Sequence, residues 1–557
     1  MNWLKHPIAP WLIGVCLILS LTNLYPLLLL MQRAFSLEGV FSLSNIQWLL
    51  ETPRVSLALR HSLFVSLSAT ILALVGGLSL AIVTTKTDLP GRMLIRALFL
   101  SPLVIPPQIL ALAWLQWAGP VGYLQQFLRG ILILHRQGPL WSLYNPGGII
   151  LLLTLFVLPI TYLTLSSGLS RVQRQTEEAA RLDGAGILQV WFYITLPLLR
   201  PYLGAAAVLA FLGSLSNFGI PAFLGIPGRY ITLPTLLYQE VINFSRGGLG
   251  HSAALALLFG LPAITFLGLQ NRLLRHDEGG LEPTTDLPDP YPLGKMGWLW
   301  GGILGLITLL VIVGPLFAMT ATALLKAYGL PLTWANLTLE NFRFILFDLV
   351  RARRAAWHSL GLATGAALIC TSLAVIVGYS VTRIKGRGLA LLRLIVDLPY
   401  ALPGLIFALS LILVWLPSPI PGISLYGTIW LLLIAYLGRF LAFSLQPIHA
   451  AWLSLDKSLE ESASIDGASL FQSFRFILLP LIAPALVAAV LLVFLQALAE
   501  LTLSALLAGS GTETLGWLVF GLQQGGYTNQ AAALSTLLVV ILFGVAAIVA
   551  RLRPQQI

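Results

Sequence analysis

The chain has 557 residues, of which 57% are hydrophobic and only 10% are charged, and its mean hydropathy is +0.89. Soluble proteins carry about 25% charged and 45–50% apolar residues, so this composition excludes a water-soluble globular enzyme and predicts a protein of the lipid bilayer. The 32 Lys and Arg against 21 Asp and Glu give a net charge of +11. Basic loops orient membrane spans, so the excess is not interpreted as nucleic-acid binding.

Twelve apolar segments approach the length of roughly 20 residues that a helix needs to cross a bilayer. They predict an all-α polytopic membrane protein with about 12 transmembrane helices, some of them kinked at prolines such as Pro102, Pro106 and Pro107. The first segment is too long for a signal-peptide core and is expected to be retained. Lys and Arg favour one side of the membrane, which predicts that both termini are cytoplasmic. The predicted spans are 9–31, 60–84, 94–118, 147–169, 201–224, 250–270, 297–322, 358–381, 391–416, 425–448, 482–509 and 531–550.

The two halves of the chain repeat each other. Twelve of the 25 residues from Glu177 to Pro201 recur between Glu460 and Pro484, at an offset of 283, whereas the offset is 297 earlier in each half. The 14 extra residues of the first half are placed in 119–146. Six spans per half is an even number, so we expect two parallel repeats that face the same way around a central pathway. The predicted division is 1–56 for the first span and outside loop, 57–270 for repeat 1, 271–296 for a cytoplasmic linker without a fold of its own, 297–353 for the seventh span and outside loop, and 354–551 for repeat 2.

The most similar part of the repeat is the cytoplasmic loop before the fifth span of each half. Thr176–Leu182 and Ser458–Ile465 are predicted as short helices that end at an Asp-Gly pair, where Gly can adopt a positive φ. A second short helix is expected to run from there to a Leu-Pro. One such loop could simply position the next span at the membrane surface. Two matching copies favour contact with a two-fold symmetric partner.

These loops resemble the EAA loop of permeases from binding-protein-dependent ABC importers, because each carries Glu-Glu, small residues, Asp-Gly-Ala and a later Leu-Pro. The resemblance covers nearly the whole chain, as two fused permease halves. It implies the type I ABC importer transmembrane fold, a bacterial inner-membrane location, two copies of an ABC ATPase subunit and an extracytoplasmic solute-binding protein. The second copy departs from the pattern at Ser462 and Ser464. The residues that the resemblance assigns to ATPase coupling are Glu177, Glu178, Ala179, Ala180, Asp183 and Gly184, and Glu460, Glu461, Ala463, Asp466 and Gly467.

The chain lacks the phosphate-binding motif Gly-x-x-x-x-Gly-Lys-Ser/Thr, and Gly294-Lys295-Met296 is the nearest approach to it. We therefore expect no enzyme activity and no cofactor in this chain, with ATP bound by the partner subunits. His61 and His358 stand at matching span starts without a second ligand at i+4, so they are interpreted as helix-end histidines and no metal site is predicted.

Three polar residues within predicted spans are candidates for the pathway or its gate, since charges are costly in a bilayer. Glu500 and its counterpart Asn217 place a polar group at one level of both fifth spans. Arg439 is the other charge expected to be buried. We expect it to form a structural ion pair with Glu500 or Asp397, with a direct substrate role as the alternative, and to act with Glu500 in one polar network.

For the cargo, the stretches Asn217–Gly225 and Thr232–Thr235 most resemble fused ferric-iron permeases. Thiamine and aminoethylphosphonate permeases are nearly as similar. Ferric iron prefers oxygen ligands, and the predicted core holds few carboxylates besides Glu500. An ion-coupled secondary transporter is the alternative from another class, but it gives no reason for matching cytoplasmic loops. A membrane-embedded enzyme is disfavoured because His, Asp and Cys are not clustered.

Overall fold

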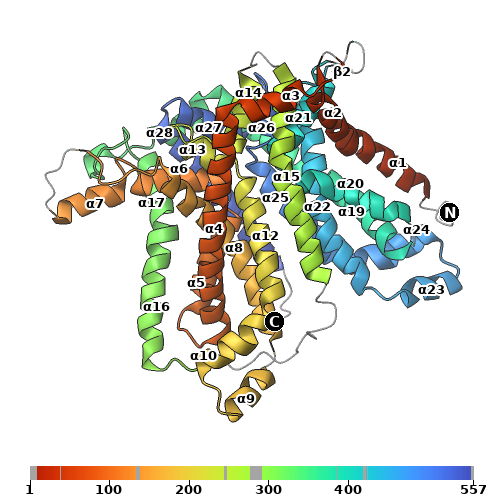
Figure 1. The fold of residues 1–557 in the computed structure, drawn as a ribbon, viewed down its shortest axis with the longest axis horizontal. Coiled ribbons are helices and arrows are strands. Elements are labelled where there is room, and N and C mark those ends of the chain that lie inside the picture. Colours follow the sequence, from red (N-terminus) through yellow and green to blue (C-terminus); the bar gives the residue numbers. More distant parts are fainter. Residues whose placement is uncertain are drawn as a thin grey trace.

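The chain folds into long helices, with one two-stranded hairpin near its start (Figure 1). The structure is a computed structural model that describes residues 9–37, 39–132, 138–172, 174–243, 248–275, 291–384, 387–417, 422 and 424–552. Most of the predicted linker, 276–290, lies outside the described residues. Labels with η mark short π- or 3-10-helical turns.

The first half begins with α1 (Ala9–Leu19), η2 (Ser20–Leu24) and α2 (Tyr25–Ala34). Strands β1 and β2 pair antiparallel, with Ser36 opposite Phe41 and Leu37 opposite Val40. The remaining elements are β1 (Ser36–Leu37), β2 (Val40–Phe41), α3 (Ser44–Glu51), α4 (Pro53–Lys86), α5 (Arg92–Leu100), η3 (Ser101–Leu103), α6 (Pro107–Ala118), α7 (Tyr123–Leu132), α8 (Pro146–Arg171), α9 (Arg174–Leu182), α10 (Ile187–Val190), η4 (Trp191–Thr195), α11 (Leu196–Leu198), α12 (Arg200–Leu215), α13 (Gly219–Leu224), α14 (Leu233–Ile242) and α15 (Gly248–Arg275).

The second half repeats most of this order. Its elements are α16 (Lys295–Thr308), η5 (Leu309–Val313), α17 (Gly314–Ala323), η6 (Trp334–Asn336), α18 (Glu340–Arg343), η7 (Phe344–Asp348), α19 (Val350–Arg383), α20 (Arg387–Ala401), α21 (Gly404–Trp415), α22 (Ile429–Ser454), α23 (Ser458–Ile465), α24 (Leu470–Ser473), η8 (Phe474–Leu478), α25 (Leu479–Leu498), α26 (Ser504–Leu507), α27 (Leu515–Gln524) and α28 (Thr528–Leu552).

The repeat is visible in the lengths of equivalent helices. Helices α4 and α19 both have 34 residues, α8 and α22 have 26, and α14 and α27 have 10. The insertion expected in 119–146 contains α7, and the residues described between α21 and α22 form no equivalent helix. The all-α membrane fold and the repeat predicted from the sequence are confirmed.

Within the described part of the chain, nine helices are long and apolar enough to cross a membrane, or up to twelve if each of three bent pairs counts as one span. The predicted spans 94–118 and 391–416 are not straight. They bend by 114° before Pro107 and by 107° before Gly404. Proline supplies no backbone N–H and keeps the preceding residue out of the helical region, so Pro106 and Pro403 break these helices instead of kinking them gently.

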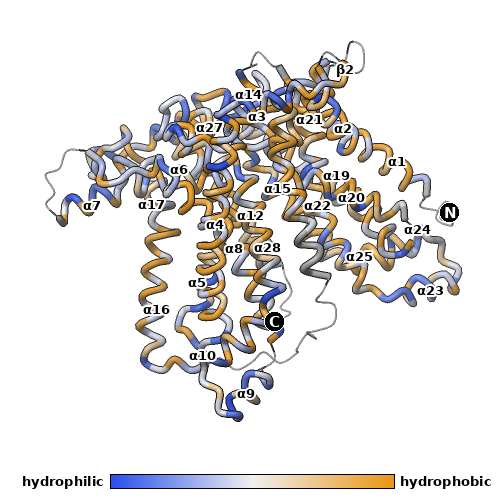
Figure 2. The backbone as a smooth tube through the Cα atoms, in the orientation of Figure 1, coloured by the Kyte–Doolittle hydropathy of each residue, from blue (hydrophilic) through white to orange (hydrophobic). Residues whose placement is uncertain are grey.

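Many large apolar side chains are exposed on the long helices. Leu72 and Val75 of α4 and Leu299 of α16 are each more than half exposed, and Figure 2 shows these helices as mainly hydrophobic along their length. In water such a surface would cause aggregation. In a bilayer it is the surface that contacts lipid.

The first span of each half packs against the other half. Helix α2 contacts α21, and α17 contacts α6. A side chain at Gly314 would place its Cβ 2.9 Å from the Trp117 ring, so α17 can approach α6 only because glycine stands there. The buried Asn23 of η2 donates a hydrogen bond of 3.3 Å to the Ile395 carbonyl of α20. The halves are therefore interlocked.

Candidate coupling loops and translocation pathway

The two repeated loops form matching helix-turn-helix projections, here called the coupling loops (residues 174–195 and 458–478). Helices α9 and α23 end as predicted, and Gly184 and Gly467 follow with φ of +88° and +82°. The Ala185 N–H donates to the Ala180 carbonyl at 3.0 Å, and Ala468 N–H donates to the Ala463 carbonyl at 2.9 Å. Both helices thus end in the same glycine-dependent turn. In Figure 1, α9 lies at the lower tip of the molecule and α23 at the lower right.

The first glutamate of loop one points inward and is only 3% exposed. Glu177 accepts hydrogen bonds from Lys86 Nζ at 3.2 and 3.3 Å, from Thr195 Oγ1 at 3.0 Å and from the Tyr291 hydroxyl at 3.0 Å. Lys86 is the last residue of α4. The ion pair therefore attaches α9 to the end of a long membrane helix.

Loop two is attached in the same way by a different set of residues. Glu460 accepts from Arg383 Nε at 2.7 Å and from the Tyr379 hydroxyl at 2.9 Å, and Arg383 also donates to the Leu455 carbonyl. Arg383 ends α19 as Lys86 ends α4, at the offset of 297. No role was predicted for these two cations, although both halves carry a basic residue at this position of the repeat.

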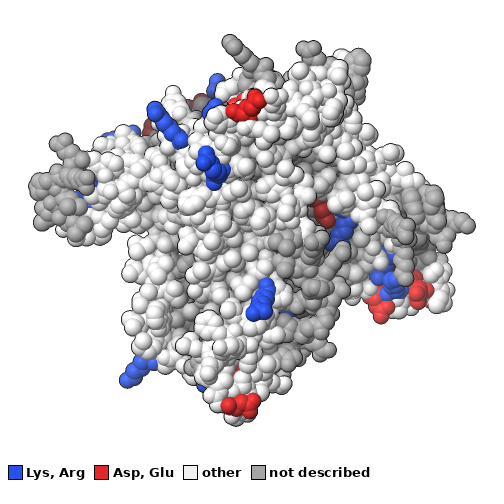
Figure 3. All heavy atoms as spheres, in the orientation of Figure 1, with Lys and Arg blue, Asp and Glu red and all other residues white. Residues whose placement is uncertain are grey.

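The other predicted coupling residues lie at or near the surface. Glu178, Ala179, Asp183 and Gly184 are exposed in loop one, and Ala180 is half-buried; in loop two Glu461, Asp466 and Gly467 are exposed, whereas Ala463 is buried. Figure 3 shows acidic atoms over both loops.

Each coupling loop also exposes large apolar side chains at equivalent positions. Leu182 and Ile465 are 89% and 85% exposed, and Leu188 matches Phe471, which is also exposed. Tyr193 corresponds to the exposed Phe476 and borders a hollow of about 420 Å³ beside the Asp-Gly turn. The two loops therefore present large apolar side chains at the same positions relative to their Asp-Gly turns.

Asn217 and Glu500 lie in breaks after the fifth helix of each half, where they bind freed backbone groups. Asn217 Oδ1 accepts from the Ile220 N–H at 3.0 Å, and Glu500 Oε1 accepts from the Leu503 N–H at 2.7 Å. Glu500 Oε2 accepts from the Ser504 N–H and hydroxyl, both at 3.1 Å. Both side chains therefore act as caps of the short helices that follow.

Arg439 binds carbonyl groups at the α20–α21 break. Its Nη1 donates to the carbonyls of Pro399 at 2.7 Å and Tyr400 at 3.0 Å, and to that of Leu402. Among the ion pairs of the described chain, none joins Arg439 to Glu500 or Asp397, and Asp397 pairs with Arg393 at 3.7 Å. The direct pair expected from the sequence is replaced by carbonyl contacts, because the break leaves carbonyls without helical donors.

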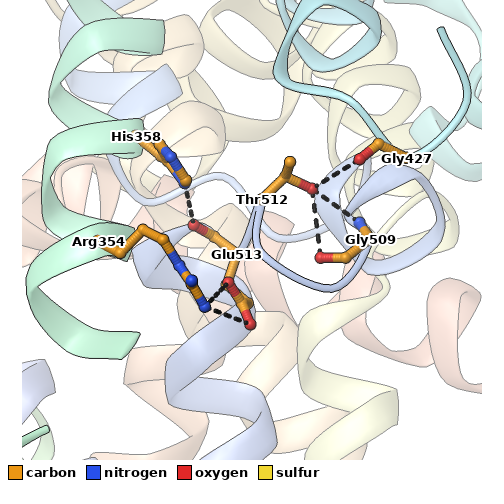
Figure 4. A network of polar contacts seen from close by, with 6 residues as sticks. All are labelled: Arg354, His358, Gly427, Gly509, Thr512 and Glu513. Carbon is orange, nitrogen blue, oxygen red and sulfur yellow. Dashed lines mark hydrogen bonds and ion pairs between the residues drawn. The ribbon is translucent and has the colours of Figure 1, made fainter. Parts of the chain in front are cut away.

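The two repeated histidines hold loops at the end of the molecule opposite the coupling loops. His358 Nδ1 lies 3.3 Å from the Glu513 carbonyl, and His61 Nδ1 lies 2.9 Å from that of Ile231. Glu513 also pairs with Arg354 at 3.1 Å (Figure 4). Within the described ranges, no group of three or more His, Cys, Asp or Glu residues could hold a metal ion.

Two family matches coincide with the two structural repeats. The family described as "Binding-protein-dependent transport system inner membrane component" matches residues 73–276 and 370–554. The chain belongs to this family. It is a fused two-half permease subunit of an ABC importer.

Similar permeases cover the chain to different extents. A ferric transport system permease protein, FbpB, of Actinobacillus pleuropneumoniae is 25% identical over 547 residues, which is 96% of this permease and 76% of that protein. The Fe(3+)-transport system permease protein FbpB 2 of Haemophilus influenzae is 26% identical over 543 residues, 96% of each chain. The molybdenum permease ModB of Escherichia coli is 30% identical over 199 residues, 35% of this permease and 83% of ModB.

Proposed function

We propose that this permease moves ferric iron from a solute-binding protein into the cytoplasm by alternating access, driven by two ABC ATPase subunits. The observation that supports this cargo is the extent of similarity. The ferric permeases match through both fused halves, whereas ModB matches about a third of the chain.

The coupling loops are the proposed docking sites for the ATPases. Their apolar tips occupy equivalent positions in both halves, which suits a partner with two-fold symmetry. Glu177 and Glu460 attach each loop to the end of α4 or α19. A displacement of a docked ATPase would therefore be passed to a membrane helix and not absorbed by a loose loop.

The polar side chains of the pathway region serve the backbone. Glu500 caps a short helix by accepting hydrogen bonds from its backbone N–H groups, and Arg439 donates hydrogen bonds to backbone carbonyls. Ferric iron requires hard oxygen ligands for tight binding, and the residues that the structure describes form no cluster of three or more carboxylates, so they would release this cargo readily. In this proposal the solute-binding protein selects the cargo, and the permease lets it pass through the membrane.

Transport can be tested by reconstituting the permease in vesicles with its ATPases and binding protein and measuring uptake of radioactive iron. We expect uptake that requires both ATP and the binding protein. Uptake of molybdate, aminoethylphosphonate or thiamine in place of iron would overturn the proposed cargo. Uptake driven by an ion gradient without ATP would overturn the ABC mechanism.

Docking can be tested by placing charge on the two tips. Both side chains are exposed, so the double variant Leu182→Asp/Ile465→Asp should insert normally. It should no longer co-purify with the ATPases, because the charges replace the proposed apolar contacts. Phe127→Asp is the matched control, since Phe127 is also exposed but lies on α7, outside the loops. Retained co-purification of the double variant would contradict the docking assignment.

The proposed orientation places the coupling loops and both termini in the cytoplasm. A reporter that is active only outside the cytoplasm should give a signal when fused after Glu340 and none when fused after Arg275. The reverse pattern would overturn the orientation.

A further inference from the structure

The two halves meet through a reciprocal set of helices. Helix α14 of the first half contacts α21 and α26 of the second. The equivalent helix α27 contacts α6, the counterpart of α21, and its Phe520 ring lies 5.7 Å from Phe223 of α13, the counterpart of α26. Each contact is matched by the contact with the roles of the halves exchanged. This reciprocity defines a two-fold interface inside one chain.

Two aromatic residues lie on the axis of that interface. Tyr238 is the sixth residue of α14, and Phe520 is the sixth residue of α27. Their ring centroids are 6.1 Å apart, with the planes at 83°. A residue that contacts its own equivalent across a two-fold axis must lie beside the axis. A central pathway between the halves runs along the same axis, so these rings stand in its path.

Two further rings fill the space around this contact. Phe218 lies 5.0 Å from Tyr238 and 6.0 Å from Phe520, between ring centroids. Phe218, Phe223 and Phe520 are all buried. In Figure 1, α14 and α27 lie at the top of the molecule and α9 at the bottom. The aromatic cluster therefore closes the end opposite the coupling loops.

The neighbouring breaks hold these rings in place. Asn217 precedes Phe218 and caps α13. The buried Gln108 of α6 donates 2.7 Å to the Ala499 carbonyl, one residue before the capping Glu500. Hydrogen bonds thus fix the backbone near Phe218 and near Glu500, whereas Tyr238 and Phe520 contact each other only through their rings. Separating the rings breaks no hydrogen bond between them.

We propose that Tyr238 and Phe520, with Phe218 and Phe223 around them, form the outer gate of the pathway, and that this structure shows the gate closed. The inference rests on the proposed alternating access. Docked ATPases that draw the coupling loops together would separate α14 from α27 and open the pathway to the binding protein.

The test uses paired cysteines in the complete transporter. Cys16 and Cys370 are first replaced by alanine, and Tyr238→Cys/Phe520→Cys is introduced. A short bifunctional thiol reagent should link the pair without nucleotide, and the link should be lost when ATP and vanadate trap the ATPases. The link should also abolish iron uptake, and cleavage of the reagent should restore it. The single variants Tyr238→Cys and Phe520→Cys each carry one thiol, so the reagent should neither link the halves nor change the iron uptake of these variants.

The control pair is Phe211→Cys/Phe266→Cys, whose rings are 4.2 Å apart within the first half. It should be linked equally with and without nucleotide. Equal linking of the 238/520 pair in both states, or transport that survives the link, would overturn the proposed gate. In that case ATP-driven iron uptake by the unlinked permease would still support the proposed function. Absence of ATP-driven uptake in the unmodified system would instead overturn the proposed function itself.

Discussion

The two coupling loops have the same shape but are held by different chemistry. Loop one buries a lysine–glutamate pair with hydroxyls from Thr195 and Tyr291, and loop two uses Arg383 and the hydroxyl of Tyr379 on the same helix. The side chain of Glu177 is 4% exposed and that of Glu460 is 23% exposed. What is common to both halves is the attachment of the loop to the end of α4 or α19, and not the residues that make it.

The largest expected effect comes from removing the first glutamate. Glu177→Ala leaves Lys86 buried without its partner, and breaking a buried pair costs about 3–5 kcal/mol. Glu460→Ala should cost less, because the side chain of Glu460 is 23% exposed and Arg383 keeps its hydrogen bond to the Leu455 carbonyl. Thermal unfolding in detergent and ATP-driven uptake measure the two losses. Lys86→Arg, which copies the cation of loop two, is the control and should retain transport. Equal losses in Glu177→Ala and Glu460→Ala would show that depth of burial does not distinguish the loops.

The turn glycines test whether both loops must keep their shape. A β-branched side chain at a positive φ costs roughly 1–3 kcal/mol, and no atom lies within 4 Å of a Cβ at either glycine. Gly184→Val and Gly467→Val should therefore reduce transport through the backbone alone, with the permease still inserted. We expect the stronger loss in loop one, which keeps the fuller motif. Asparagine tolerates this conformation, so Gly184→Asn and Gly467→Asn should retain transport. Full uptake and ATPase association in the valine variants would contradict the docking assignment.

The capping side chains Asn217 and Glu500 should also contribute unequally to the free energy of unfolding. Loss of a cap costs about 0.5–2 kcal/mol. Glu500→Ala removes three hydrogen bonds and should fall at the upper end, whereas Asn217→Ala removes one. Glu500→Gln keeps an acceptor oxygen and should lose less than Glu500→Ala. Unfolding midpoints measured side by side decide this, and a larger loss in Asn217→Ala would refute it.

The smallest expected effect is the coupling between Glu500 and Arg439. No ion pair joins the two side chains and each binds the backbone of a different break, so the double variant Glu500→Gln/Arg439→Gln should lose only slightly less than the sum of the two single losses. A clearly smaller loss in the double variant would restore the single polar network expected from the sequence.

Residue patterns along the chain could predict the helices, the repeat and the coupling loops, because each depends on local features such as apolar length or an Asp-Gly pair. The ion pair between Lys86 and Glu177 joins residues 91 positions apart, and Tyr291 reaches the same carboxylate from within the predicted linker. Prolines predict where a span can kink, but neither they nor hydropathy give the size of the bend, so the bends of 114° and 107° could not be predicted. The carbonyl ligands of Arg439 exist only because one of those breaks forms.

The packing of α2 and α17 on opposite halves bears on how the protein is made. As the chain is synthesised, α6 is complete at Ala118, but its partner α17 begins at Gly314. The face of α6 that carries Trp117 must therefore wait, in the membrane, for nearly two hundred further residues to be inserted. Fusion of the halves makes that wait safe, because every copy of the first half brings its own second half. One chain thus supplies both halves, with Asn217 in the first and Glu500 in the second.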